Sequence, residues 1–398
     1  MKNLQYKIFI ALSYFFFYSL LALEFTYVPS YLTEILNFKG QDMSILFAGI
    51  PIVGILAQFV WGELADRCKK TGRILRIITC CAFLCSIPLI FYNSNVLIYI
   101  IFWLVSFFLT SVSALLDTMI FTRWDMKTYG KIRLWGSMGY GVAALIFAYL
   151  LLYQDKFLNF IILLLIGIAF LLFISTLFIG EETRTKTQNK ESNFKFVSLF
   201  KNSYFLLLVV FGVVHYITNG PYNMIFDIYR KDMNLPVYCT GWAISIGIVS
   251  ECLFIAYGSF FVKRLTAHFC LILCAVLTGI RWFIMSYPLN ATVFISMQAI
   301  HGITFGLFFI ASVACLINIV PESMRATGQT MFSCIVFSLG GCLGNYMTGY
   351  LLDFPGRGFL AFRCCAIISI IAVIISFFIK EKIDTNCNSN VQFFIKNL

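Results

Sequence analysis

The stretch Gly62-Glu63-Leu64-Ala65-Asp66-Arg67-Cys68-Lys69-Lys70-Thr71-Gly72-Arg73 is the most informative segment of the chain, because it lies between two apolar runs. The runs cover residues 44–64 and 74–92. Each is long enough to cross a bilayer as a helix, which takes about 20 mostly apolar residues. The stretch therefore predicts a short charged loop between two antiparallel membrane helices.

Apolar runs of similar length continue on both sides of this stretch, through all 398 residues. We expect twelve spans. In the first half they lie near residues 7–32, 44–64, 74–92, 96–121, 133–153 and 158–179. In the second half they lie near residues 203–229, 240–262, 267–287, 292–318, 327–352 and 358–380. The sequence thus predicts an all-α, polytopic membrane protein with a lipid bilayer around it.

The composition excludes several other classes of protein. Apolar residues make up 60% of the chain and charged residues only 12%, whereas soluble domains have about 25% charged residues. A soluble enzyme, a disordered chain and a secreted disulfide scaffold are excluded, and the runs lack the alternation of membrane β-strands. Most of the 14 cysteines lie inside apolar runs, where they act as small apolar side chains. We expect no metal and no cofactor.

The longest polar stretch, residues 180–202, separates two blocks of nearly equal length. This layout is typical of a duplicated six-helix unit, so we expect two pseudo-symmetric six-helix bundles. The expected parts are an N-terminal bundle (1–179), a cytoplasmic linker (180–202), a C-terminal bundle (203–380) and a short cytoplasmic tail (381–398).

The net charge of +11 has a simple interpretation. Most lysines and arginines fall in the gaps that share a side with the N-terminus. Cytoplasmic loops of membrane proteins carry such an excess. The pattern predicts a multi-pass protein of the cell (inner) membrane with both termini in the cytoplasm. It gives no reason to expect a nucleic-acid partner.

Three polar residues lie deep in consecutive spans of the second half: Glu251, Arg281 and His301. A charge at mid-bilayer costs about 2.5–3.5 kcal/mol on insertion scales, so it normally faces a cavity or a partner. We expect Glu251 and Arg281 to pair, directly or through His301. A buried carboxylate beside a titrating histidine suits proton coupling. A purely structural salt bridge is the alternative.

Two further acids are candidates in the first half. Asp117 ends a polar stripe at helical spacing on the fourth span. The stripe consists of Ser106, Thr110, Ser113 and Asp117. It predicts either a solute path or a helix contact, and Asp117 could instead pair with Arg123 or Arg133. Glu24, in the first span, is either a buried acid or a carboxylate that reaches the interface.

The seventh span also carries polar side chains at helical spacing: His215, Asn219 and Tyr222, with Gly220-Pro221 between them. Proline removes a backbone hydrogen bond and bends a helix. A broken helix with polar groups is a common binding-site element of transporters. A plain kink with a satisfied histidine is the alternative.

The stretch at 62–73 resembles the loop signature of the major facilitator superfamily, G-x-L-A-D-R-x-G-R, with two extra residues before its last Gly-Arg pair. The matching residues are Gly62, Asp66, Arg67, Gly72 and Arg73. The resemblance implies the major facilitator fold, a monomer, and a gate loop that holds the two halves together on the cytoplasmic side.

Other patches resemble the phenylpropionate permeases and the nucleoside–proton symporters. They are residues 129–137, residues 321–329, and the set Glu251, Arg281 and His301. The lactose permease branch is similar, but it has a glutamate where this chain has Thr304. The resemblance therefore assigns the proton-carrying role to Glu251.

These features predict a secondary transporter, a proton-coupled symporter that imports a small organic solute by alternating access. Its partners would be protons and an aromatic acid such as phenylpropionate, or a nucleoside. A sugar–proton symporter or an efflux permease of the same superfamily is the alternative. A lipid-modifying membrane enzyme is disfavoured, because the three histidines are far apart and show no catalytic spacing. We expect no catalytic residues.

Overall fold

The computed structural model describes residues 2–68, 70–91, 94–121, 123–124, 126–153, 155–180, 199–321 and 324–379. The first half contains α1 (Lys2–Thr26), α2 (Val28–Glu34), α3 (Gly40–Cys68), α4 (Thr71–Ser86), η1 (Ile87–Ile90), α5 (Asn95–Leu109), α6 (Val112–Phe121), α7 (Met126–Tyr153), η2 (Asp155–Phe160) and α8 (Ile161–Leu177). Most of the predicted linker and the predicted tail lie outside the described residues.

The second half is also helical. It contains α9 (Ser203–Ile217), α10 (Gly220–Met224), α11 (Phe226–Asp232), α12 (Tyr238–Leu265), α13 (Ala267–Met285), α14 (Ala291–Ser296), η4 (Met297–Ile300), η5 (Gly302–Leu307), α15 (Phe308–Ile319), α16 (Arg325–Leu351) and α17 (Arg357–Phe378). In the described part, eleven helical segments are long and apolar enough to cross a membrane, and α9 is a shorter apolar helix. The predicted all-α polytopic fold is confirmed.

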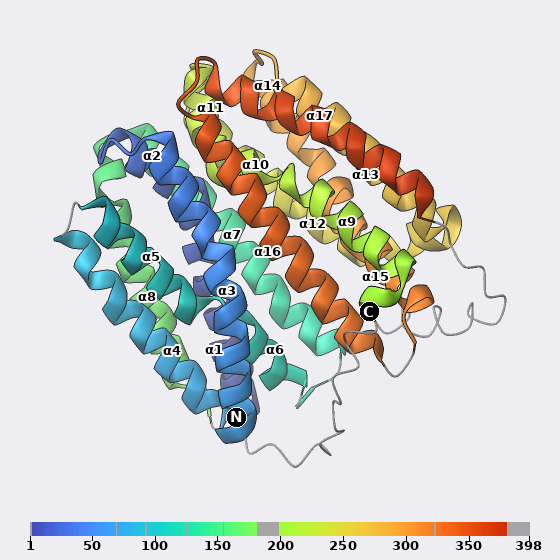
Figure 1. Ribbon diagram of the computed structural model, residues 1–398. Helices are drawn as coiled ribbons and strands as arrows, with labels where there is room; N and C mark the ends of the chain where they lie inside the picture. Colours follow the sequence, from blue (N-terminus) through green and yellow to red (C-terminus); the bar gives the residue numbers. More distant parts are fainter. Residues whose placement is uncertain are drawn as a thin grey trace.

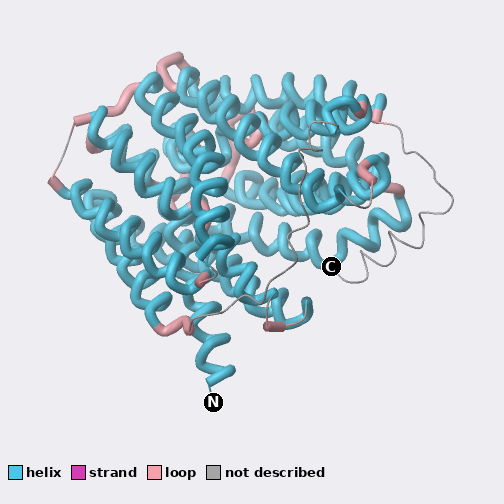
Figure 2. The backbone as a smooth tube through the Cα atoms, turned by 60° about the horizontal axis from the view of Figure 1, so that its bottom comes forward, coloured by secondary structure: helices cyan, strands magenta, loops and turns pink. Residues whose placement is uncertain are grey.

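The helices of the two halves lie on opposite sides of a long seam (Figure 1). Along it, α3 packs against α16 and α7 packs against α12. The helices are long and the described loops short (Figure 2). The seam agrees with a duplicated chain, and the proposed boundaries between two bundles stay a prediction.

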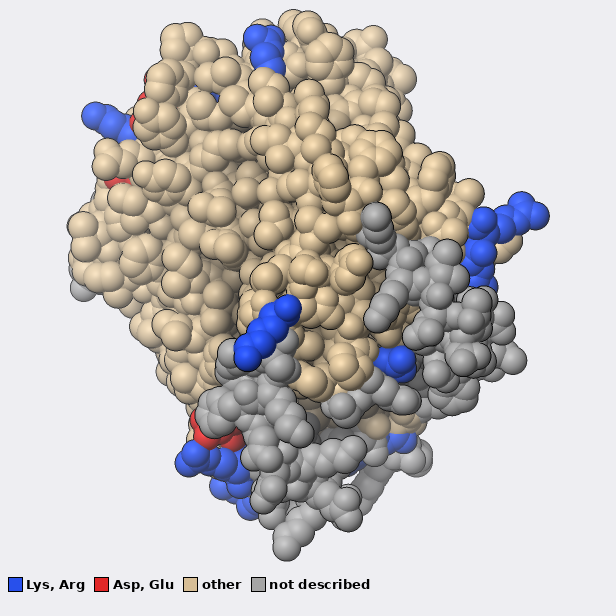
Figure 3. All heavy atoms as spheres, turned by 45° about the vertical axis from the view of Figure 1, so that its right-hand side comes forward, with Lys and Arg blue, Asp and Glu red and all other residues tan. Residues whose placement is uncertain are grey.

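The outer surface is that of a protein surrounded by lipid. Large apolar side chains such as Phe59, Ile370 and Phe377 are more than half exposed. Figure 3 shows a broad area without charged side chains, with Lys and Arg toward its margins. Burying apolar surface in lipid tails is as favourable as burying it in a protein core, so the bilayer accounts for this exposure.

The seventh span, expected at 203–229 with a bend or break at Gly220-Pro221, is broken there and once more at Ile225. Helix α9 ends at Ile217, α10 begins at Gly220, and α11 begins at Phe226. The first break is explained by Pro221, whose ring nitrogen has no proton to donate. The second break is at Ile225, whose φ of −119° and ψ of 13° depart from helical values.

Other spans are also interrupted where the apolar runs are continuous, among them the fourth and the tenth. The fourth is α5 followed by α6, with a turn at Thr110 and Ser111. The tenth passes from α14 through a 3₁₀ turn (η4) into a π-helical segment (η5) before α15. We call residues 302–307 the π segment. Such segments are rare and are frequent at functional sites.

Candidate functional site

The three polar residues predicted deep in the second half come together in one buried cluster. His301 links the other two: its Nε2 lies 3.6 Å from Oε2 of Glu251, and its Nδ1 accepts a hydrogen bond from Nη1 of Arg281 at 3.1 Å. We call these residues, with Gln298 and Thr304, the histidine cluster. The pairing of Glu251 with Arg281 therefore runs through His301.

Arg281 is fully buried, and the acceptors that the described residues offer it are neutral. Its Nη2 donates to the side-chain oxygen of Gln298, and its Nη1 also donates to Oγ1 of Thr304 at 3.2 Å. The guanidinium lies over the ring of Trp282 at 4.2 Å and near the ring of Tyr222 at 5.0 Å. Cation–π contacts of this kind stabilise a desolvated cation.

Glu251 is the most exposed member of the cluster, with 22% of its side chain accessible. It interacts electrostatically with four tyrosines, two from each half: Tyr18, Tyr140, Tyr216 and Tyr222. Tyrosines of both halves thus lie within electrostatic range of the Glu251 carboxylate. This surrounding offers both hydrogen bonds and aromatic faces to a solute.

Two glycines allow the elements of this cluster to approach. A Cβ on Gly302 would lie 2.3 Å from the carbonyl oxygen of Ser250, so only glycine lets the π segment touch α12. A Cβ on Gly247 would lie 3.0 Å from the hydroxyl of Tyr222. Glycine at these positions brings Glu251, His301 and Tyr222 to one site.

Asp117 lies in a second polar cluster, which belongs to the first half. Its Oδ1 accepts a hydrogen bond from the hydroxyl of Tyr14. Nη2 of Arg133 donates to the hydroxyl of Tyr18 at 2.5 Å, and the guanidinium lies 4.2 Å above that ring. We call Tyr14, Tyr18, Asp117 and Arg133 the arginine cluster.

The polar stripe that ends at Asp117 makes helix contacts. Thr110 lies against Gly54 of α3, and the hydroxyl of Ser113 is 3.4 Å from that of Tyr18 on α1. Thr110 also returns a hydrogen bond to the carbonyl of Ser106 at 2.6 Å, beside the turn that interrupts the span. Tyr18 thus connects the stripe to Arg133.

The residues predicted on the seventh span diverge because that span is broken. Tyr222 joins the histidine cluster, with its ring 4.9 Å from that of His301. His215 lies behind the cluster, and its Nε2 is 2.8 Å from the carbonyl oxygen of Thr304. Asn219 is buried at the break before α10, and its side chain does not cap that helix.

Glu24 stands apart from both clusters. It is only 5% exposed on α1, and it makes no hydrogen bond or ion pair with the residues that the structure describes. A buried carboxyl group without a partner is costly in its charged form.

The predicted gate loop is described only in part, because the side chain of Asp66 lies outside the described residues. Arg67 pairs with Glu63 on its own helix at 2.5 Å. A Cβ on Gly62 would meet no atom within 4 Å, so α3 is not tightly packed there. Gly72 is buried near the start of α4.

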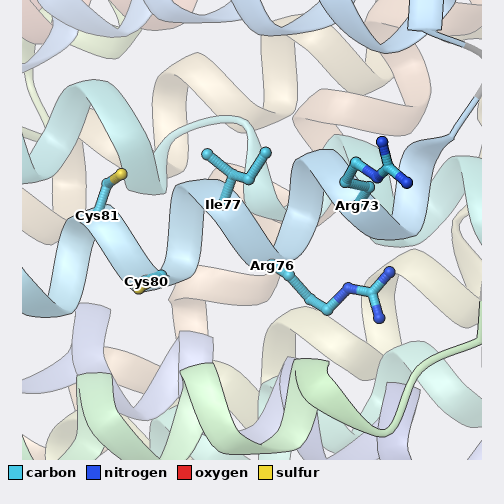
Figure 4. A pocket seen from close by; sticks show the side chains of 5 residues that line it. All are labelled: Arg73, Arg76, Ile77, Cys80 and Cys81. Atoms are coloured by element: carbon cyan, nitrogen blue, oxygen red, sulfur yellow. The ribbon is translucent and has the colours of Figure 1, made fainter.

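Arg73 borders a shallow hollow of about 440 Å³ on α4 (Figure 4). Its lining consists of Arg73, Arg76, Ile77, Cys80 and Cys81. None of these belongs to either cluster, so the hollow is separate from the candidate site. Among the described residues, no group of three or more His, Cys, Asp or Glu side chains could hold a metal ion.

Sequence reasoning missed Gln298, and in the arginine cluster it missed Tyr14 and Tyr18 as site residues. Gln298 is an amide inside an apolar run, three residues before His301, and that isolation was an available signal. Tyr14 and Tyr18 lie one helical turn apart in a run rich in phenylalanine. Their pairing with Asp117 and Arg133 joins three spans, and spacing along one span does not reveal it.

The amino-acid sequence is similar to a known protein family over most of its length. The pattern of the MFS_1 like family matches residues 7–364. The chain is 24% identical to the uncharacterized transporter YwbF of Bacillus subtilis (strain 168) over 81% of each chain. It is 23% identical to the maltose permease of Geobacillus stearothermophilus, over 92% of this chain and 93% of that one.

The xanthosine permease of Escherichia coli (strain K12) is 22% identical over 82% of each chain. Among solved structures, that of the nucleoside transporter NupG is similar, with a TM-score of 0.81 and 19% identity over 94% of this chain and 98% of that chain. At that identity the likeness concerns the fold.

Proposed function

The chain belongs to the MFS_1 like family, and from that membership we propose that it is a proton-coupled symporter that imports a small organic solute by alternating access. Its family and fold make it a multi-pass membrane transporter and not an enzyme. The observation that carries the proposal is the Glu251–His301–Arg281 connection, which ends in a partly accessible carboxylate.

The geometry favours Glu251 over His301 as the group that takes up the proton. Nδ1 of His301 already accepts a hydrogen bond from Arg281, so the single proton of the ring is on Nε2, which faces Glu251. A second ring proton would have to replace the Arg281 bond beside a cation. A proton that enters the cluster therefore goes to the Glu251 carboxylate.

Protonation would couple to the solute by changing what Glu251 offers it. The ionised carboxylate only accepts hydrogen bonds, whereas the protonated form also donates one. The two forms differ in affinity for the solute and for the tyrosines of the two halves, and such a difference shifts the balance between conformations.

We propose a nucleoside as the solute, because the surroundings of Glu251 suit a neutral molecule with hydroxyl groups and an aromatic ring. Tyr18, Tyr140, Tyr216 and Tyr222 supply rings and hydroxyls, and Asp117 and Arg133 lie beside Tyr18 through the arginine cluster. The xanthosine permease among the relatives gives this class further support.

An aromatic acid is the second candidate, and Arg133 is the observation that favours it. This guanidinium donates to a tyrosine, and among the described residues it makes no direct ion pair with an acid. Arg281 does not support an acidic solute, because it is fully buried and its Nη atoms already have acceptors. Competition by nucleosides, aromatic acids and sugars against a labelled nucleoside in proteoliposomes separates these classes.

The coupling role is tested with Glu251→Gln in proteoliposomes with an imposed proton gradient. We expect the variant to lose accumulation against a gradient while it still exchanges labelled for unlabelled solute. The matched control is Asp232→Asn, which removes a carboxylate from the exposed pair with Arg357. If Glu251→Gln still accumulates solute uphill, Glu251 is not the coupling acid.

A further inference from the structure

His215 lies outside the solute-facing part of the candidate site, yet it contacts the segment that carries the site. Its Nε2 is 2.8 Å from the carbonyl oxygen of Thr304, in the middle of the π segment. A carbonyl oxygen only accepts hydrogen bonds, so Nε2 carries the proton and donates it. This contact joins the seventh span to the tenth.

The π segment leaves carbonyl groups available for such donors. The peptide N–H of Phe308 donates to the carbonyls of Ile303 and Phe305, so the usual α-helical bond from Phe308 to Thr304 is not made. His215 supplies a donor to Thr304 in its place. From the other side, the thiol of Cys274 on α13 donates to the carbonyl of Ile303 at 3.1 Å.

Thr304 connects this backbone contact to the histidine cluster. Its carbonyl accepts from His215, and its side-chain Oγ1 accepts from Nη1 of Arg281 at 3.2 Å. The same Nη1 donates to Nδ1 of His301, the residue just before the π segment. A shift of the Thr304 backbone would therefore change two hydrogen bonds of Arg281.

The surroundings of His215 suit a fixed donor rather than a proton carrier. The ring is 1% exposed and stacks on Phe308 at 4.4 Å and on Phe211 at 5.8 Å. Its Nδ1 has no hydrogen-bond partner in the described part of the chain. A second proton on the ring would thus have no acceptor.

We propose that His215 is a positioning residue that holds the π segment, so that Arg281 and His301 keep the geometry needed to couple Glu251 to protons. The proposal rests on the proposed function and deepens it. The described groups around the π segment that titrate or carry charge are His215, Tyr216 and Tyr222 from the seventh span, Glu251 from α12, Cys274 and Arg281 from α13, and His301.

The test compares His215→Phe with His215→Gln. Phenylalanine keeps the ring stack and removes the donor, whereas glutamine has an amide that can donate to the Thr304 carbonyl. We expect His215→Phe to lower proton-driven uptake about tenfold, as loss of a buried hydrogen bond does. We also expect it to move the pH midpoint of uptake by about half a unit or more. His215→Gln should keep most of the parent protein's proton-driven uptake, and its pH midpoint should stay close to that of the parent protein.

The matched control is His268→Phe. His268 makes a bond of the same kind, from Nε2 to the carbonyl of Ser376 at 2.9 Å, between α13 and α17 and away from the cluster. The His268→Phe variant should lose as much stability as His215→Phe, and its pH midpoint of uptake should stay unchanged. If His215→Phe lowers uptake with an unchanged midpoint, or if His268→Phe moves the midpoint equally, the positioning role is wrong.

Hydrogen–deuterium exchange of residues 302–309 gives a readout that does not depend on transport. We expect faster exchange in His215→Phe than in His215→Gln or the parent protein. Equal exchange in all three would overturn the positioning role while leaving the proposed function intact. Absence of proton-driven uptake in the parent protein would overturn the proposed function, and the exchange result would still decide whether His215 holds the segment.

Discussion

Arg281 shows how a full positive charge is held inside the membrane without a direct acid partner. Its Nη atoms donate to Gln298, His301 and Thr304, and two aromatic rings lie beside it. Hydrogen bonds to charged groups are worth about 1.5–3 kcal/mol each. No carboxylate touches the guanidinium in the described structure. The neutral acceptors therefore carry the stabilisation of its charge that an acid would otherwise supply.

Gln298→Leu tests this interpretation at a single acceptor. The substitution keeps the side-chain volume roughly constant and leaves a further N–H group of Arg281 without an acceptor, besides Nε, which has none among the described residues. We expect a loss of about 1–3 kcal/mol in the free energy of unfolding, because a buried charged donor would lose its partner. Thermal unfolding of the purified protein in detergent measures the loss.

Gln58→Leu is the control for that experiment, because Gln58 lies on an exposed face of α3. Removing its amide should leave the unfolding temperature unchanged or raise it slightly. If both substitutions lower the unfolding temperature equally, Gln298 contributes nothing specific to the Arg281 site.

The elements that carry the site are the irregular ones. Regular helices satisfy all their interior backbone groups internally, and this is why they can cross a bilayer. The seventh and tenth spans give up some of these bonds, and the freed groups are taken up by neighbours, as His215 does for Thr304. The breaks thus bring polar groups into the interior with little exposed backbone.

Gly220→Ala tests the packing of the broken seventh span. A Cβ at this position would lie 2.3 Å from the carbonyl oxygen of Gly344 and 2.7 Å from the hydroxyl of Thr348. Both atoms belong to α16, and the nearer one is backbone, so α10 would have to move. We expect a loss of about 1–3 kcal/mol in stability, the usual cost of overpacking, together with reduced uptake.

Gly167→Ala is the matched substitution in a regular helix. A Cβ on Gly167 of α8 would meet no atom within 4 Å, and alanine is favoured over glycine in a helix by about 0.5–1 kcal/mol. Stability should stay the same or rise. If Gly220→Ala behaves like Gly167→Ala in thermal unfolding and uptake, the close contact between α10 and α16 is not required.

The predictable part of the fold is the part that local sequence determines. Apolar length marks most spans, because the bilayer has a fixed thickness. Glu251, Arg281 and His301 are recognisable because polar groups in an apolar run are costly. The Gly220-Pro221 break also follows from local chemistry.

The remaining features depend on contacts between distant segments. The π segment has no local marker, since it depends on the approach of Ser250 to Gly302 and on the donor from His215. The break at Ile225 has no local breaker residue either. The sequence predicts Glu251 and His301 as partners of Arg281 but not Gln298. A neutral side chain cannot be recognised as a partner from its charge.

At the scale of the whole molecule, polar contacts join the two halves toward the end marked by α2 and α11 (Figure 1). Ser30 donates to Asp227 at 2.8 Å, and Lys231 pairs with Glu34 at 2.5 Å. The backbone N–H of Gly40 donates to the carboxylate of Asp353 at 2.7 Å. These contacts keep this end of the seam closed.

Asp227 is at the centre of this closed end. Besides Ser30 from the other half, it accepts from Thr240 at 2.7 Å and pairs with Arg230 at 2.9 Å, and all of these side chains are buried. A buried carboxylate with this many donors is well satisfied, and of the three Asp227 contacts named here only the one from Ser30 crosses the seam and must break when the halves separate. The proposed alternating access requires that separation once in each transport cycle.

A crosslink across this end should therefore stop transport. Glu34→Cys with Lys231→Cys, joined by a short cleavable thiol crosslinker in a background without reactive native cysteines, would fix α2 to α11. We expect uptake to fall to background and to return when the crosslinker is cleaved. Solute should still bind from the opposite side, because only the α2–α11 end is held closed.

The control crosslink joins two residues within one half at the same end, Asp232→Cys and Arg357→Cys, which replace a pair 2.9 Å apart in the native protein. It constrains α11 against α17 and leaves the seam free. Radiolabelled uptake before and after cleavage compares the two variants. If the crosslinked 34–231 pair still transports, these contacts are bystanders, and the halves do not need to separate at the α2–α11 end. If both crosslinks block uptake, movement between α11 and α17 is also required, and the block by the 34–231 pair is not specific to the seam.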